Sequence, residues 1–147
     1  MQPLQFLVPL GPLEAVAGLI PYVVLVLVLA NMVTRYLGHE AHLRQAEDGG
    51  DEAISRYVPH TVTSVLLVLS TFAYMLVEPH GGMVMSVLVI AVFLADFFEL
   101  EARQVEARND MPIEPPKSAL AASGLALLYA AYQSLFFVVA PVWNAVI

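Results

Sequence analysis

The sequence predicts an all-α integral membrane protein, a bundle of four transmembrane helices with both termini outside. The composition is 59% hydrophobic and only 13% charged, whereas an ordinary soluble domain is about 25% charged. Four apolar segments are each long enough to cross a bilayer, and every Lys and Arg falls on one side of them. The length favours a single transmembrane domain over residues 1–147.

The four segments each supply the roughly 20 apolar residues that cross a hydrocarbon core of about 30 Å. Pro59 begins the second segment, and Pro141 ends the fourth. Pro79 to Gly82 form a sharp turn between the second and the third. The predicted spans are residues 12–37, 59–78, 82–103 and 116–140, joined on one side by loops 38–58 and 104–115.

The first span can begin in two ways. Pro12 suits the first turn of a helix, but a helix from Pro12 would contain Pro21, and an internal proline kinks a helix. Residues 1–20 therefore belong either to one kinked span or to a separate interfacial segment that precedes a span from Pro21.

The basic residues predict the orientation. All six lie in or beside the two long loops: Arg35, Arg44, Arg56, Arg103, Arg108 and Lys117. Because Lys and Arg accumulate in cytoplasmic loops, these loops are expected to be cytoplasmic and both termini outside. The expected location is the cell membrane, as a multi-pass protein.

The predicted cytoplasmic side is acidic. All 13 acidic residues except Glu14 and Glu78 fall there, against six basic ones. This balance argues against nucleic-acid binding, and it would repel anionic lipid headgroups rather than bind them. Acidic loops, a preference for Arg over Lys, and abundant Ala and Val resemble small four-span membrane proteins of halophilic archaea. The resemblance covers the whole chain and implies no functional residues.

Several kinds of chemistry are unsupported by the sequence. The chain has no Cys, which removes disulfides, thiolate nucleophiles and cysteine-ligated metals. His39 and His42 supply two ligands where zinc needs three or four, so we expect no metal site. His60 and His80 lie about 30 Å apart along a helix and cannot ligate one haem iron within a subunit. We expect no cofactor and no catalytic activity.

The second span has a polar face. Its hydroxyl side chains recur at helical spacing and form one stripe: Thr63, Ser64, Ser70, Thr71 and Tyr74. In lipid this stripe is expected to face other helices, or alternatively to line a hydrated path.

The fourth span has a face of small residues, which lets two helices approach closely. These residues recur every four positions: Ser118, Ala122, Ala126, Ala130 and Ser134. The partner of this face is either another span or a neighbouring subunit.

Two acids lie near the end of the third span. Asp96, Glu99 and Arg103 share one side of a helix, and Glu99 with Arg103 has the spacing of an ion pair. An unpaired charge at the centre of a membrane helix costs at least about 2.5 kcal/mol, so both acids are expected to find partners. The cations at the same level are Arg35, His60 and Lys117. We expect an ion-pair cluster that closes the cytoplasmic end, with proton or cation handling as the alternative.

The leading functional hypothesis is a non-catalytic accessory or structural subunit of a larger membrane assembly, or a homo-oligomer. Its expected partners are membrane lipids and other membrane subunits or copies of itself. One alternative is a small ion or proton channel or transporter that uses the polar stripe with Asp96 and Glu99. The other is a haem-binding membrane subunit.

Overall fold

The computed structural model describes residues 10–49, 55–109 and 111–146, and this part of the chain is helical, without strands. Four of the helices are long and apolar enough to cross a membrane: α2 (Ile20–Gly49), α3 (Val58–Val77), α4 (Pro79–Arg108) and α5 (Lys117–Val146). The predicted all-α fold with four apolar spans is confirmed, and it is compatible with a multi-pass membrane protein.

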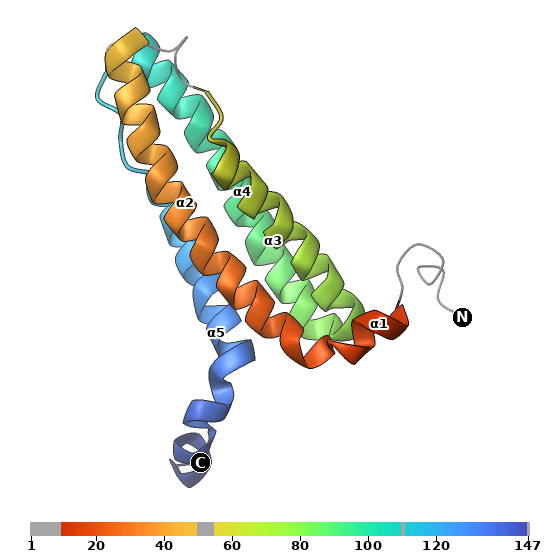
Figure 1. Cartoon of the computed structure of the whole chain (residues 1–147). Helices are drawn as coiled ribbons and strands as arrows, with labels where there is room; N and C mark the ends of the chain where they lie inside the picture. Colours follow the sequence, from red (N-terminus) through yellow and green to blue (C-terminus); the bar gives the residue numbers. More distant parts are fainter. Residues whose placement is uncertain (1–9, 50–54, 110, 147) are drawn as a thin grey trace.

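The four long helices form a bundle in which each packs against two neighbours. α3 contacts α2 and α4, and α5 contacts α4 and α2. The end of α2, the start of α3, the end of α4 and the start of α5 all lie towards one end of the bundle (Figure 1). The turn between α3 and α4 lies at the other end, as do α1 (Leu10–Ala15) and the end of α5. We call these the loop end and the terminal end.

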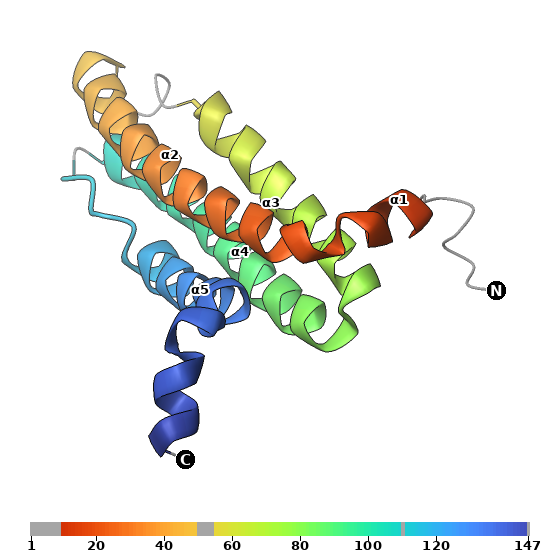
Figure 2. The same ribbon diagram turned by 60° about the horizontal axis from the view of Figure 1, so that its bottom comes forward.

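The chain enters the bundle through a short separate segment. α1 is followed by a 3-10 turn, η2 (Ala17–Leu19), and α2 begins at Ile20. Pro21 thus lies in the first turn of α2, where its missing N–H costs no helical hydrogen bond. α1 points away from the axis of α2 (Figure 2). Of the two possible beginnings of the first span, the structure has the one with a separate preceding segment.

The helices run past the predicted ends of the spans. Residues 38–49 continue α2, and residues 104–108 continue α4, although loops were expected at 38–58 and 104–115. α5 likewise continues to Val146 with Pro141 inside it, although Pro141 was expected to end the fourth span, because a proline can bend a helix without ending it. Apolar composition marks where lipid ends, but a helix continues until a breaker stops it. Gly38 alone lowers helix stability by only about 1 kcal/mol, which is too little to end α2. The helix therefore continues through charged residues beyond the predicted membrane boundary.

The centre of the bundle is apolar. Its largest fully buried apolar side chains come from α2, α3 and α4 and are Val24, Leu67, Met85 and Val89. α3 and α4 are joined by Glu78 alone, so their ends must pack closely. A Cβ on the buried Gly82 would collide with the backbone of Met75, and this close approach therefore requires glycine.

The small-residue face of α5 is turned inward, with a register that differs from a strict four-residue repeat. Ala126, Ala130 and Ser134 are buried, whereas Ala122 is half-buried and Ser118 is exposed. Towards the loop end the buried positions are instead Ala119 and Ser123. Positions four residues apart rotate gradually around a helix of 3.6 residues per turn. The step of three residues from Ser123 to Ala126 offsets this rotation and keeps the buried face towards α2 and α4.

Candidate functional site

A charged cluster joins the helices near the loop end. Arg35 of α2 donates to both carboxylate oxygens of Asp96 of α4, from Nε to Oδ1 and from a terminal nitrogen to Oδ2, each at 2.8 Å. His60 Nε2 of α3 lies 3.0 Å from the same Oδ2. The Arg35 side chain is 1% exposed and that of Asp96 is 15% exposed. Paired charges of this kind are tolerated in a low-dielectric environment that would not hold either one alone.

Arg35 also reaches the fourth long helix. Its NH1 donates to Ser123 Oγ of α5 at 2.6 Å, and Ser123 donates in turn to the Ala119 carbonyl. A second bond from its NH2 runs to Asn31 Oδ1, one turn earlier on α2. A single guanidinium therefore has bonds to α4, to α5 and to its own helix.

Asn31 and Thr34 continue this cluster to α3. The amide of Asn31 donates to Thr63 Oγ1 and Ser64 Oγ, each at 3.0 Å. Thr34 Oγ1 lies 2.8 Å from His60 Nδ1. Both ring nitrogens of His60 thus have polar neighbours, which leaves neither one available to a haem iron without rearrangement.

A second polar contact lies closer to the loop end. Arg103 of α4 donates from NH1 to His42 Nδ1 at 3.0 Å, and His42 Nε2 donates to the Ser55 carbonyl at 2.7 Å. An arginine can only donate and a carbonyl can only accept, so His42 holds its proton on Nε2. This chain of contacts ties the extension of α2 to α4 and to the segment that leads into α3.

Not every predicted partner joins the cluster. Glu99 accepts a hydrogen bond from Ser118 Oγ at 2.6 Å, across the interface of α4 and α5. Arg103, one turn further along α4, faces His42 rather than Glu99. Lys117 is exposed at the first residue of α5. Within the described ranges, the ion pairs of Asp96 are those with Arg35 and His60.

The polar stripe of α3 divides into two parts. Towards the loop end, Thr63 and Ser64 belong to the Asn31 network. Further along, Ser70 and Thr71 donate to carbonyls of their own helix, those of Leu67 and Val68.

At the terminal end, the last residue of the stripe makes a further polar contact between helices. Tyr74 Oη donates to Gln133 Oε1 of α5 at 2.8 Å. Gly81 leaves room for this bond, since a Cβ there would come within 2.9 Å of the tyrosine oxygen.

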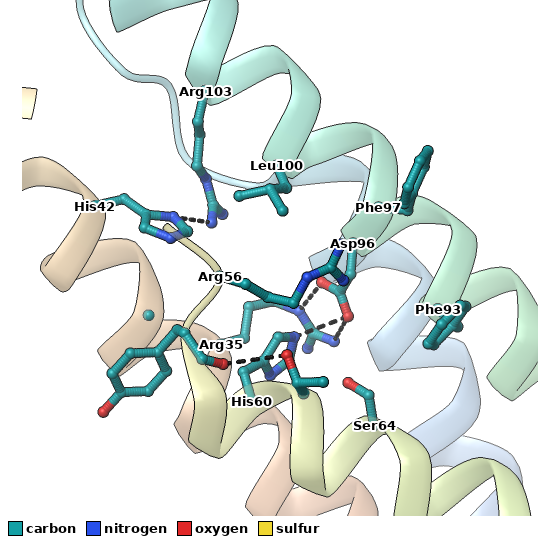
Figure 3. A pocket seen from close by; sticks show the side chains of 13 residues that line it. Arg35, His42, Arg56, His60, Ser64, Phe93, Asp96, Phe97, Leu100 and Arg103 are labelled. Carbon is teal, nitrogen blue, oxygen red and sulfur yellow. Dashed lines mark hydrogen bonds and ion pairs between the residues drawn. The ribbon is translucent and has the colours of Figure 1, made fainter. Parts of the chain in front are cut away.

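A cavity of about 70 Å³ adjoins the cluster, between α2, α3 and α4 (Figure 3). Phe93, Phe97 and Leu100 form an apolar wall on α4. In Figure 3 Arg35 and His60 converge on Asp96, and the Arg103 guanidinium points towards His42. The Arg, His and Asp residues that line the cavity are Arg35, His42, Arg56, His60, Asp96 and Arg103.

A metal centre has no support in the described part of the chain, where no group of three His, Asp or Glu side chains could hold an ion. His39 and His42 lie on the helical extension of α2 rather than in a loop, and His42 is buried. His80 is exposed at the start of α4.

Comparison with known proteins gives a family. A model described as "Domain of unknown function (DUF7313)" matches residues 2–147. The chain belongs to this family. No curated protein and no solved structure matches the chain. The family description names no activity, so a function must be argued from the geometry of the DUF7313 fold.

Three residues that bond within or beside the cluster were absent from the predicted site: Thr34, His42 and Ser123. Thr34 is uncharged and directly precedes Arg35 at the end of an apolar run, where its spacing does not mark it as a partner of His60. Ser123 lies beside the predicted small-residue face, where a serine looks like a packing residue. His42 was assigned to a loop, and only the continuation of α2 turns it towards Arg103.

Proposed function

We propose that this DUF7313 protein is a non-catalytic accessory or structural subunit of a membrane assembly, or forms a homo-oligomer, through the C-terminal part of α5. The observation that supports this is the projection of the end of α5 away from the bundle (Figures 1 and 2). Large apolar side chains on this part are exposed: Phe137, Val138, Val139, Val142, Trp143 and Val146.

The length of α5 indicates that these exposed apolar side chains lie beyond the part of the helix needed to cross a membrane. Twenty residues from Lys117 cover about 30 Å and end near Phe137. Two contacts set the level of α5 against the rest of the bundle: Ser118 meets Glu99 near one end, and Gln133 meets Tyr74 near the other. Residues after Phe137 therefore extend past the hydrocarbon core, where lipid chains no longer cover apolar side chains. Pro141 lies within this part and favours a bend.

The polar side chains of the described residues support a structural role. Arg35, Asn31 and Asp96 form hydrogen bonds with one another and with neighbouring helices. Such a cluster fixes the bundle, and the molecule is left with an apolar outer surface suited to lipid and to partner helices.

The orientation and location belong to the same proposal. All six Lys and Arg residues lie in the half of the bundle nearest the loop end, which by the positive-inside rule is cytoplasmic. Both termini then lie outside, and the protein resides in the cell membrane. The acidic, arginine-preferring composition supports an origin in a halophilic archaeon.

Ion or proton transport is a second candidate, favoured by the contact of Asp96 and His60 with the cavity. We rank it lower because Leu67, Met85 and Val89 fill the core between that cluster and the Tyr74–Gln133 pair. A flux assay on reconstituted protein tests it: transport that Asp96→Asn and Glu99→Gln abolish would favour this candidate over a structural role.

The assembly proposal is tested by purification in mild detergent followed by native mass measurement. We expect a complex with a second protein or with further copies. The double variant Val142→Gln, Trp143→Gln should lose that complex, whereas Met111→Gln, at an exposed apolar residue of the α4–α5 connection, should keep it. A lone monomer from the unaltered chain would refute the proposal.

A further inference from the structure

The cavity beside Asp96 is basic in an acidic protein. Three of its lining residues are arginines, and its one carboxylate is Asp96, so it has a formal excess of two positive charges. The whole chain, by contrast, has a net charge of −7. The overall balance would repel anionic headgroups, but the fold gathers half of the six basic residues at this cavity.

Arg103 lines this cavity and has an unsatisfied buried donor. The residue is 7% exposed, and its Nε has no hydrogen-bond partner, although its NH1 contacts His42. Buried polar atoms are nearly always paired, and an arginine fork matches the geometry of carboxylate and phosphate oxygens. An anion in the cavity would bring acceptor oxygens to the side chain that carries this donor.

The acids near Arg103 do not supply that anion. Glu99 accepts the hydrogen bond of Ser118, and Glu106 accepts one from the Glu114 backbone. Neither carboxylate lines the cavity. Asp96 does, but both of its oxygens already accept bonds from Arg35.

The depth of the cavity indicates the source of the anion. Along α4, Asp96 lies about 25 Å from Pro79 and Arg103 about 36 Å. A hydrocarbon core of about 30 Å therefore ends between them, and Arg103 lies at the level of lipid headgroups. Phe93 and Phe97 line the same cavity from the hydrocarbon side and are exposed on α4, where an acyl chain would pass.

We propose that this cavity binds the phosphate group of a lipid headgroup, held by Arg103 and Arg56 with the lipid chain against Phe93 and Phe97. The inference is independent of the proposed assembly through α5. The volume of about 70 Å³ exceeds the roughly 10–15 Å³ that one water requires. Free phosphate carries the same chemistry without the chain, and the experiment separates the two sources.

Native mass spectrometry of the delipidated full chain tests the proposal. The probes are a short-chain phosphatidylglycerol, inorganic phosphate, and a diacylglycerol of the same chain length without phosphate. We expect phosphatidylglycerol to bind more tightly than either of the others. Equal binding of inorganic phosphate, with the same dependence on the arginines, would assign the site to free phosphate. Equal binding of diacylglycerol would overturn the proposal.

Variants show whether binding occurs at this cavity. Arg103→Gln and Arg56→Gln should each weaken phosphatidylglycerol binding about tenfold or more, since each removes a charge-assisted hydrogen bond. Arg44→Gln is the matched control, because Arg44 is exposed on α2 and outside the cavity lining. Arg56 is exposed, so its variant should fold even if the Arg103 variant does not. Unchanged binding by Arg56→Gln and by folded Arg103→Gln, or equal weakening by Arg44→Gln, would contradict the proposal.

Discussion

Arg35 of α2 and Asp96 of α4 are bonded through both carboxylate oxygens across the centre of the bundle, between two helices that do not pack directly on each other, with each donor 2.8 Å from its acceptor. The two residues are 61 positions apart in the chain. Their bond brings a charge from the first long helix and one from the third into a single buried unit. Ser123 and His60 add the other two long helices to it.

Removing either partner should destabilise the bundle strongly. Asp96→Asn or Arg35→Gln leaves the opposite buried charge without its bidentate partner, and breaking a buried ion pair in this way costs about 3–5 kcal/mol. Unfolding in detergent with increasing denaturant measures it. The double variant should lose less than the sum of the two single losses, and Arg44→Gln, at an exposed site, should be near neutral. Additive single effects would contradict a direct coupling.

Gly82→Ala should also destabilise the fold. Its Cβ would meet the Met75 backbone, which cannot give way as a flexible side chain can, and overpacking typically costs about 1–3 kcal/mol. Gly124→Ala is the matched control, since a Cβ on this α5 glycine meets nothing within 4 Å. There the change should be neutral or stabilise by up to about 1 kcal/mol. Equal effects at the two positions would contradict the close α3–α4 packing.

His42→Ala should loosen the loop end of the bundle. The change removes the acceptor of Arg103 and the donor to the Ser55 carbonyl, at a cost of about 1–3 kcal/mol. Amide hydrogen exchange should become faster in the helical extension of α2, while the core of α3 stays protected. His80→Ala, at an exposed position, should leave exchange there unchanged. Unaltered exchange in His42→Ala would show that the contact does not hold the extension.

The orientation can be tested directly because the chain has no Cys. In intact cells, a membrane-impermeant thiol reagent should label His80→Cys at the terminal end but not Arg44→Cys at the loop end. Both positions are exposed. After the membrane is opened, both should react. Labelling of Arg44→Cys alone in intact cells would reverse the proposed topology.

The sequence predicted the four long helices well because membrane spanning depends on local apolar length, which a sequence displays directly. It also identified Asp96, Arg35 and His60 as candidates, because charged residues within or near apolar spans are few. Their pairing could not be derived, since it depends on how the helices are rotated against one another. Glu99 shows this: its spacing favoured Arg103, but the structure gives it Ser118 across a helix interface.

Helix ends and the charge of the cavity were harder to predict. α2 continues through residues 38–49 because no strong breaker follows the apolar run. That continuation carries His42 to Arg103 and helps to enclose the cavity. The net negative charge of the loops gave no indication that three arginines would lie around one cavity. A charge count along the chain does not show which residues come together in the fold.

Site-specific crosslinking in native membranes tests the central proposal, assembly through the end of α5, most directly. A photoreactive group attached at Trp143→Cys, on the projecting part of α5, should capture a second protein or another copy of the chain. The same group at Leu128→Cys, exposed in the middle of α5, should capture mainly lipid. Capture at Trp143→Cys that does not exceed capture at Leu128→Cys would contradict assembly through this segment.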